Sequence, residues 1–334
     1  MKRSAVTLEE ICLWPNLAQA FWRAASAKRQ RAEVRAFEAD FERKLADLGR
    51  EVLQGRYFPA PLQQFTVYDP KTRCIRAPVF RDRILHHALM AVIGPELERS
   101  WVDDSFACRL GKGTGAAIKR AQRNLRRYPW YLQFDVVSFF DSIDHSRLMA
   151  RLRRRFRNQP LLELCRRIIT AYGLDSNRGL PIGALSSQYF ANHSLEPLDR
   201  FLQERLRVKA MVRYMDDGIG WFPSRLDGKR AQEKIESFAA AELGLKLHRF
   251  RLQRSDRGLS FLGLRLDGRN AYPGLRRRRL YRKGRRAWER AWSLGEIEGP
   301  ELQRGFSACL AALDGTDAKA WREKELKFRE PVDA

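Results

Sequence analysis

The stretch that decides the fold is residues 130–145, which read WYLQFDVVSFFDSIDH. Its first five residues form a largely apolar run that predicts a buried strand, and Asp135 follows this strand directly. Asp144 or Ser146 is then placed to cap a helix that runs through Leu148. We therefore expect a carboxylate at the end of a buried strand, just ahead of a helical segment.

A second stretch, residues 211–222 (MVRYMDDGIGWF), sets two apolar runs around Asp216 and Asp217 and predicts a hairpin. Taken alone, the Asp-Asp pair is also compatible with an ordinary polar turn. If this hairpin lies beside the strand that ends at Asp135, three carboxylates meet at one edge of a sheet. Such a cluster is costly unless cations lie within it. Two Mg²⁺ ions would neutralise it and hold both oxygens of an in-line phosphoryl displacement.

The charge balance of the 334-residue chain indicates a polyanionic partner. Lys and Arg number 64 and Asp and Glu 40, which gives a formal net charge of +24. Hydrophobic residues make up 44%, too many for a disordered basic tail, so we expect one large domain or two or three subdomains. A basic excess by itself is equally typical of ribosomal and membrane-surface proteins.

Cysteine, histidine and hydropathy patterns exclude other classes. The five cysteines are an odd number without CxxC spacing, which favours reduced thiols in a cytosol, mostly buried as small apolar groups. The five histidines lack zinc-ligand spacing, so any metal should be oxygen-bound. The longest uncharged apolar stretch, residues 88–95, is far short of the roughly 20 residues that span a bilayer, so no membrane partner is expected.

Weaker patterns flank these two stretches. Residues 31–55 predict one amphipathic helix, residues 65–67 a strand followed by a turn over 68–73, and residues 82–98 a second helix. Residues 111–115 (GKGTG) have neither the phosphate-loop nor the dinucleotide-binding spacing and predict a loop. A short strand is expected at 259–263. The composition then becomes strongly basic, which places a boundary near residue 275.

Six segments, in this order, resemble motifs of reverse transcriptases. They are residues 71–78 with 81–83, 105–109 with 111–113, 134–145, 179–188, 213–217 and 259–263. The resemblance implies an α+β, right-hand polymerase fold with fingers, a palm of antiparallel sheet plus helices, and a short helical thumb. It places the N-terminal region and fingers at 1–130, the palm at 131–275 with a helical insertion at about 146–178, and the basic thumb at 276–334.

The resemblance also implies roles for single residues. Asp135, Asp216 and Asp217 would be the catalytic carboxylates and would bind two Mg²⁺ ions, with the backbone carbonyl of Val136 as a further ligand. Arg73 would hold the incoming triphosphate, with Arg83 as a second candidate. The primer grip would be Phe261, Leu262 and Gly263.

Phe140 stands where these enzymes place an aromatic ring that excludes a ribose 2′-hydroxyl, so the product should be DNA. RNA-copying RNA polymerases usually carry Asp there, and ordinary core packing beside Phe139 is the alternative for Phe140. Ile182 replaces a glutamine that contacts the nucleotide in many relatives, which implies lower fidelity, with errors concentrated at template adenines. Gln188 is a further candidate contact to template or nucleotide.

Two basic segments carry further predictions. The arginine run at residues 276–286 predicts contact with the phosphates of a template–primer duplex or structured RNA, although a solvated helix face remains an alternative. Its candidate residues are Arg276, Arg277, Arg278, Arg279, Arg282 and Lys283. In the loop expected after Gly244, Arg251 occupies the place of a lysine that donates a proton to the leaving pyrophosphate. Arginine is a poor proton donor, which leaves Lys246, His248 or solvent.

Pro181-Ile182-Gly183 and Ser187-Gln188 resemble the reverse transcriptases of diversity-generating retroelements. This subtype implies a bacterial or phage-encoded cytoplasmic enzyme that copies a template RNA into error-prone cDNA. Its partners would be a structured or non-coding RNA, an RNA–DNA heteroduplex, dNTPs and a basic accessory protein. A related reverse transcriptase that acts in antiphage defence with its own non-coding RNA is the alternative. A catalytically idle RNA-binding scaffold is a third hypothesis, which the three carboxylates disfavour.

Overall fold

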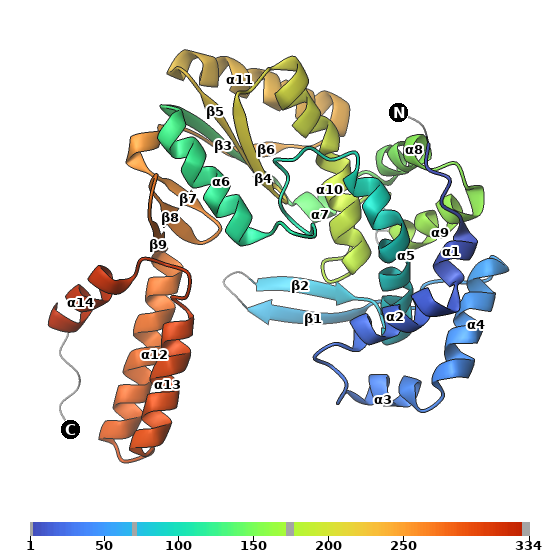
Figure 1. The fold of residues 1–334 in the computed structure, drawn as a ribbon, viewed down its shortest axis with the longest axis horizontal. Helices are drawn as coiled ribbons and strands as arrows, with labels where there is room; N and C mark the ends of the chain where they lie inside the picture. The colour runs from blue at the N-terminus through green and yellow to red at the C-terminus, as the bar shows by residue number, and fades with distance from the viewer. Residues whose placement is uncertain (1–2, 69–71, 172–176, 329–334) are drawn as a thin grey trace.

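The computed structural model describes residues 3–68, 72–171 and 177–328. Helices and antiparallel sheets both contribute, so the α+β prediction is confirmed. Figure 1 shows the N-terminal helices on one side, a long helical hairpin on the other, and a four-stranded sheet with its helices joining them. Among the described residues, no helix has the length and apolar character needed to cross a membrane.

The N-terminal part is mainly helical. Its elements are α1 (Leu8–Cys12), α2 (Trp14–Ala25), α3 (Ala32–Glu38), α4 (Phe41–Leu53), β1 (Gln63–Tyr68), β2 (Thr72–Ala77), α5 (Phe80–Glu98) and α6 (Thr114–Arg127). The single helix predicted over 31–55 is wrong, because the chain breaks at Ala39 and Asp40 into α3 and α4. Asp40 leaves the helical region (φ −138°, ψ 47°), and the break lets Phe37 and Phe41 pack around the ring of Phe21.

The central sheet has the strand order β4-β5-β3-β6, antiparallel throughout. Its strands are β3 (Trp130–Val136), β4 (Ala210–Tyr214), β5 (Asp217–Phe222) and β6 (Leu247–Arg254). The associated helices are α7 (Phe139–Ser142), α8 (His145–Arg155), α9 (Gln159–Thr170), α10 (Leu185–Arg200) and α11 (Arg225–Phe238), with shorter turns η1 (Phe201–Arg205), η2 (Ala239–Leu243) and η3 (Ser255–Arg257). The predicted strand at 130–134, the hairpin around Asp216 and the Asp144 cap of α8 are confirmed.

The two faces of this sheet belong to different cores because side chains alternate along a strand. Leu132 and Phe134 enter the large core shared with α10 and α11, whereas Tyr131 enters a second core with α6 and the strands after η3. A glycine is required at position 218, because a Cβ there would lie 2.4 Å from the ring of Phe134 on the neighbouring strand. Odd-numbered residues of β3 therefore face α6, and Asp135 is among them.

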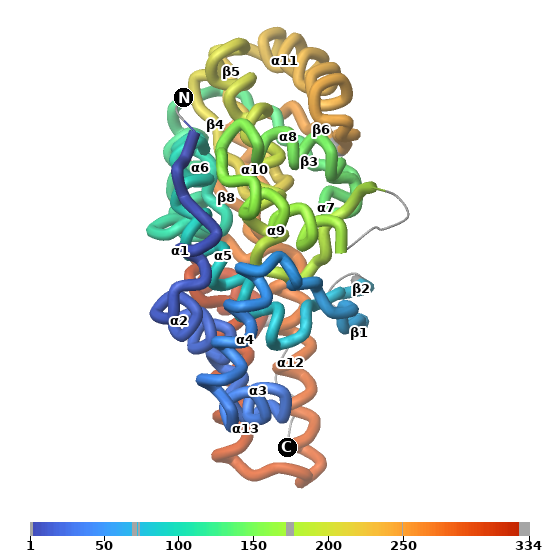
Figure 2. Tube along the Cα trace, turned by 90° about the vertical axis from the view of Figure 1, so that its right-hand side faces the viewer, coloured from blue at the N-terminus to red at the C-terminus, as the bar shows by residue number. Residues whose placement is uncertain are grey.

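The C-terminal part begins with a small sheet of β7 (Leu259–Phe261), β8 (Leu264–Leu266) and β9 (Ala271–Pro273). It continues into α12 (Leu275–Ser293), α13 (Gly299–Ala311) and α14 (Lys319–Phe328). Figures 1 and 2 both show α12 and α13 as an antiparallel pair that extends away from the central sheet. The pair is close, since Gly305 lies against the indole of Trp288 and Gly284 against the thiol of Cys309.

Several further strands were not predicted, namely β2, β6, β8 and β9. The loop expected after Gly244 is wrong, because residues 247–254 form edge strand β6. The expectation that the cysteines are mostly buried is also wrong: Cys165 and Cys309 are buried, Cys12 and Cys108 are half-buried, and Cys74 is exposed. All five are free thiols, as predicted. Residues 69–71 of the predicted 68–73 turn lie outside the described residues.

Candidate active site

The carboxylates at 135 and 217 come together through strand pairing. In the β3–β5 register Phe134 lies opposite Gly218, so Asp135 follows at the end of β3 beside Asp217, the first residue of β5. Asp216 precedes it in the β4–β5 turn. Directly paired residues point to the same face of a sheet. Asp135 and Asp217 therefore lie next to each other at one edge of the central sheet, with Asp216 in the adjoining turn.

A pocket of about 240 Å³ opens at this edge. It is lined by Gln133, Phe134, Asp135, Asp217, Arg251 and Ser260. The side-chain amide of Gln133 donates to Asp217 Oδ1 at 3.0 Å and to the backbone carbonyl of Ser260 at 3.2 Å. Gln133 thus links the carboxylate edge to β7, the strand that carries the expected primer grip.

Burial makes negative charge costly here. Burial is the largest cause that raises the pKa of the Asp217 carboxyl to about 7; the charges of Asp135 and Asp216 contribute to this rise, and the hydrogen bond from Gln133 opposes it. Among the described residues, no group of three or more His, Cys, Asp or Glu side chains forms a ready metal-binding cluster. Mg²⁺ needs only one or two carboxylates when water and phosphate oxygens complete its shell. The donor set at this edge fits that ion better than a metal held by protein alone.

Arg213 hydrogen-bonds to the turn that contains Asp216. Met215 has φ +55°, a left-handed conformation that is costly for a non-glycine residue. Arg213 Nη1 donates to the Met215 carbonyl at 2.9 Å and to Asn192 Oδ1 at 2.9 Å. Its Nε and Nη2 atoms each donate to the Asp199 carboxylate at 2.7 Å. Arg213 and Asp199 are 1% and 0% exposed, so this bidentate pair fixes the turn without contact with solvent.

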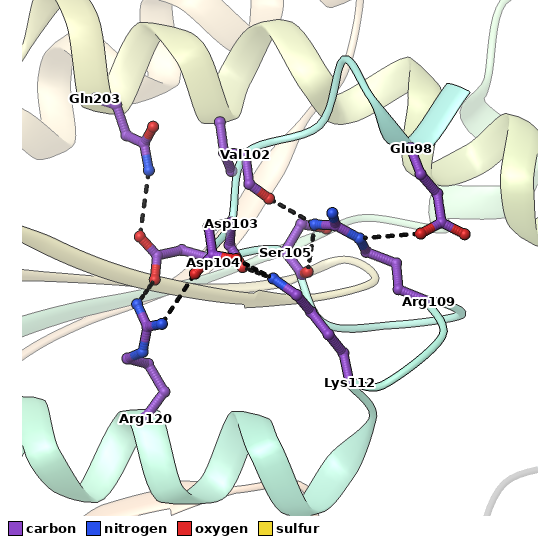
Figure 3. A network of polar contacts seen from close by, with 9 residues as sticks. All are labelled: Glu98, Val102, Asp103, Asp104, Ser105, Arg109, Lys112, Arg120 and Gln203. Carbon is purple, nitrogen blue, oxygen red and sulfur yellow. Dashed lines mark hydrogen bonds and ion pairs between the residues drawn. The ribbon is translucent and has the colours of Figure 1, made fainter. Parts of the chain in front are cut away.

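The loop at 102–113 is tied to the other side of β4. The backbone N–H of Arg213 donates to the Asp104 carbonyl, and the N–H of Phe106 donates to the Arg213 carbonyl. Figure 3 shows how this loop is braced: Arg120 of α6 and Gln203 of η1 both bind the Asp104 carboxylate. The same figure shows Lys112 with Asp103, and Arg109 donating to the carbonyls of Val102 and Ser105.

The residues expected to meet the nucleotide come from three segments that pair with one another. Phe140 of α7 is half-buried, packs edge-on against Phe139, and accepts a backbone hydrogen bond from Leu180. Two residues later the carbonyl of Ile182 accepts from the N–H of Arg76 in β2. Backbone hydrogen bonds therefore join the 179–183 segment to α7 on one side and to β2 on the other.

The other residues predicted to contact the nucleotide lie in three different surroundings. Gln188 lies in α10, where its side chain accepts from the Cys108 thiol at 3.2 Å. Arg83 lies in α5 and forms an ion pair with Glu33 of α3, so its guanidinium is directed to the N-terminal helices. For Arg73 the structure describes only the backbone, which pairs with Val67 across the β1–β2 hairpin.

The remaining predicted sites lie in the C-terminal part. Phe261 is buried, and Leu262 and Gly263 form the β7–β8 turn with φ +49° and +76°. Among the basic candidates on α12, Arg277 binds the Asp314 carbonyl, Arg278 the Pro273 carbonyl, and Arg282 the Glu325 carboxylate. Arg276, Arg279 and Lys283 are exposed. With Arg286 and Arg290, also exposed, they recur at three or four residues along one face of α12.

No role is predicted from the sequence for Gln133 or Arg213, and the loop expected to carry Arg251 is wrong. Gln133 could have been found from its place two residues before Asp135 on the same strand, and Arg213 from the oddity of a charge inside an apolar run. Arg251 had been assigned to a loop, but it lies in β6 opposite Gln133 and lines the carboxylate pocket. Of the alternative proton donors, His248 lies opposite Asp135 in the β3–β6 register and Lys246 is exposed just before β6.

Part of this chain is similar to known proteins. The family model for "Reverse transcriptase (RNA-dependent DNA polymerase)" matches residues 68–266. The chain is 29% identical over 177 residues to Protein YkfC of Escherichia coli K12, which covers 48% of this chain and 46% of that protein. It is 24% identical over 177 residues to the group II intron-encoded protein LtrA of Lactococcus lactis, covering 50% of this chain and 29% of LtrA. The chain thus spans less than half the length of these relatives.

Among solved structures, the fold is similar to apo telomerase from Candida tropicalis, with a TM-score of 0.51 at 12% identity over 65% of this chain and 49% of that one. Telomerase from Candida albicans in complex with a telomeric RNA fragment gives a TM-score of 0.50 at 13% identity, over 84% of this chain and 57% of that one. The right-hand polymerase fold predicted from the sequence is confirmed at the level of the fold.

Proposed function

The chain belongs to the reverse transcriptase (RNA-dependent DNA polymerase) family, and from this we propose that it is an RNA-directed DNA polymerase. One observation carries the proposal: Asp135 and Asp217 lie beside each other on one face of the central sheet, with Asp216 in the adjoining turn. Burial raises the pKa of Asp217 at this edge, so bound cations would offset the cost of placing carboxylates together there.

The subdomains follow from this proposal. We assign the fingers to residues 1–130, the palm to 131–275 and the thumb to 276–334. Support for these limits comes from two element boundaries, since β3 begins at Trp130 and α12 at Leu275. The helices α8 and α9 then correspond to the insertion at about 146–178.

The metal proposal rests on the carboxylate edge. Asp135 and Asp216 would hold two Mg²⁺ ions, with Asp217 and the backbone carbonyl of Val136 completing the protein's share. When bound, the ions supply neutralisation of the phosphates and of the charge that develops as a primer 3′-hydroxyl displaces pyrophosphate. Gln133 keeps the Asp217 carboxylate oriented, and the Arg213 cluster keeps the turn of Asp216 in place.

Substrate recognition is assigned to the segments that pair around α7. Phe140 would exclude a ribose 2′-hydroxyl, Arg73 would bind the triphosphate, and Ile182 and Gln188 would line the nucleotide. We give Arg83 a smaller part, because its guanidinium is paired with Glu33. Residues 261–263 would hold the primer end. The exposed basic face of α12 would follow the phosphates of an RNA–DNA heteroduplex, where its contacts would release counterions.

We further propose that the enzyme is of the diversity-generating retroelement type, bacterial or phage-encoded, and that it acts in the cytoplasm with a template RNA and a basic accessory protein. Support comes from Ile182 and from Ser187-Gln188, where other bacterial enzymes carry different residues. An apolar side chain at 182 cannot donate a hydrogen bond to the nucleotide, so geometric checking should weaken. Sequencing of the RNA that co-purifies with the protein tests this subtype. A template repeat with adenine mismatches to a nearby gene supports it, and a dedicated non-coding RNA favours antiphage defence.

Primer extension on an RNA template with Mg²⁺ tests the polymerase proposal. We expect Asp216→Ala to abolish extension while the protein remains folded. Asp256→Ala is a matched control, because that carboxylate lies exposed in η3 and forms an ion pair with Arg254 at the end of β6. Equal incorporation by the wild type and Asp216→Ala would overturn the proposal.

A further inference from the structure

Three side chains follow one another on the same face of β3. Side chains alternate along a strand, so Tyr131, Gln133 and Asp135 all point to the side on which β7 packs. Figure 1 shows β7 next to the central sheet on this side, close to α6. Tyr131 is buried there, whereas Gln133 and Asp135 are half-buried and line the carboxylate pocket. This face of β3 therefore leads from a core into the proposed catalytic site.

Two of these side chains bind the backbone of the segment that contains β7. The Tyr131 hydroxyl donates to the carbonyl of Gly258 at 3.0 Å, and the Gln133 amide donates to the carbonyl of Ser260 at 3.2 Å. The two donors and the two acceptors are each two residues apart, so this segment runs alongside β3. Strand β7 lies at the edge of its small sheet, and an edge strand has backbone groups that no neighbouring strand pairs with. Side chains of β3 thus help to hold β7 against the central sheet.

Gln133 differs from Tyr131 because it also binds a carboxylate. Its amide nitrogen donates to Asp217 Oδ1 at 3.0 Å, and among the described residues no other side chain that lines the pocket donates to Asp217. An amide nitrogen carries two hydrogens, so both donors are in use. The reversed amide is excluded, because it would set the side-chain oxygen against the Ser260 carbonyl, which has no proton to donate. One side chain therefore joins Asp217 of β5 to β7.

The backbone that carries Gln133 is held on both sides. Gln133 lies opposite Ile219 of β5 and opposite Arg251 of β6. The β3–β6 register then shifts between Gln133 and Asp135. Such irregularities in a sheet re-aim side chains and are common beside active sites. Gln133 thus occupies the last position of β3 before the shift, where its main chain is fixed by two neighbouring strands.

We propose that Gln133 is a positioning residue that fixes the separation between the primer end and the Asp217 carboxylate. This inference rests on the proposed function, in which residues 261–263 hold the primer end and Asp217 is one of the catalytic carboxylates. Ser260 directly precedes Phe261, so Gln133 binds β7 one residue before the primer grip. Reacting atoms must lie about 3–3.5 Å apart, and a misplacement of about 1 Å can lower a rate a hundredfold. Loss of the two hydrogen bonds should therefore slow nucleotide addition without weakening substrate binding.

Single-nucleotide primer extension in saturating Mg²⁺ tests this role. The rate at saturating dNTP, the KM for dNTP and the Kd for primer–template are measured separately. The test variants are Gln133→Met, which keeps the length of the side chain, and Gln133→Glu, which keeps its shape, and neither can donate to both acceptors.

The matched control is Gln253→Met. Gln253 lies in β6 opposite Tyr131, and its amide donates to the Gly258 carbonyl at 3.4 Å. The control therefore removes an amide that binds the same segment at a distance from the carboxylates. The Gly258 carbonyl still accepts from Tyr131 in this variant, so β7 should keep its place.

We expect both Gln133 variants to add nucleotides about ten- to a hundredfold more slowly at saturating dNTP, with unchanged KM for dNTP and unchanged Kd for primer–template. Gln253→Met should behave as the wild type. An unchanged rate in the Gln133 variants, or equal slowing in Gln253→Met, would overturn the proposal. Failure of the wild type to extend any primer would instead contradict the proposed function.

Hydrogen exchange of the metal-free protein gives a readout that does not depend on activity. The backbone N–H groups of residues 259–264 should exchange faster in Gln133→Met than in the wild type, and Gln253→Met should leave their exchange unchanged. Thermal unfolding of each variant shows whether the fold is retained. Equal exchange of this segment in Gln133→Met and the wild type would show that Gln133 does not hold β7, and the proposal would fall.

Discussion

Replacing Asp217 by Asn should stabilise the protein, although it removes a carboxylate from the proposed catalytic site. Burial and the neighbouring charges raise the pKa of Asp217 to about 7 from an ordinary value of 3.8. Between these two pH values the carboxyl is protonated in the folded chain and ionised in the unfolded chain. The stability that it contributes is therefore present below about pH 3.8 and is lost as the pH rises through 7.

The magnitude follows from the same two values. A difference of one pH unit corresponds to about 1.4 kcal/mol, so the free energy of unfolding should fall by about 4 kcal/mol between pH 4 and pH 7 because of this group alone. Asn keeps the shape of the side chain, and its Oδ1 can still accept from Gln133. The stability of Asp217→Asn relative to the wild type should thus be close to zero at pH 4 and reach a few kcal/mol at pH 8.

Urea unfolding in EDTA at several pH values measures this difference. A suitable control is Asp144→Asn, because the negative charge of Asp144 stabilises the folded chain, whereas that of Asp217 destabilises it. Burial raises the pKa of Asp144, but hydrogen bonds from Ser146 and from the backbone of Arg147 outweigh it and lower the pKa overall. Asp144→Asn should therefore destabilise the protein at neutral pH, and its effect should shrink on acidification.

Added Mg²⁺ gives a second readout. If the carboxylate edge binds the ion, millimolar Mg²⁺ should stabilise the wild type at pH 8 by mass action and narrow its gap to Asp217→Asn. A difference that stays flat from pH 4 to pH 8, or an Asn variant that is less stable throughout, would refute the electrostatic reasoning.

Three further predictions follow from the site. Arg213→Met should lower the free energy of unfolding by about 3–5 kcal/mol, because it leaves the Asp199 carboxylate buried and unpaired. The double variant Arg213→Met with Asp199→Asn should regain part of this lost stability, as measured by urea unfolding of the two single variants and the double variant. Phe140→Ala should raise ribonucleotide relative to deoxynucleotide incorporation in primer extension, and an unchanged ratio would assign the ring to packing beside Phe139 alone. Ile182→Gln should reduce misincorporation opposite template adenine, as measured by sequencing the cDNA, and an unaltered error spectrum would remove this residue from the fidelity argument.

The parts of the site that could be predicted are those where one strand carries both the packing signal and the chemistry. The apolar run before Asp135 and the hairpin around Asp216 and Asp217 fix which strands pair, and pairing then fixes which side chains meet. Strand β6 is not predicted, although Phe250 and Leu252 alternate with charged or polar residues, because the resemblance implies a loop after Gly244. An edge strand tolerates such charges on its solvent side.

The hydrogen-bonded cluster around Arg213 shows why other parts of the site could not be predicted from the sequence. Its partners Asp199 and Asn192 belong to α10, and Ser105 belongs to the braced loop, so no local pattern joins them. A buried charge inside an apolar run signals only that some partner must exist, since an unpaired guanidinium would not be tolerated there. Once paired, the cluster does more than neutralise a charge. It donates to the carbonyl of Met215, whose left-handed backbone turns the chain at the point where Asp216 is presented. The turn that carries Asp216 is therefore held in place through residues of α10, so the sequence of the hairpin alone does not determine its position.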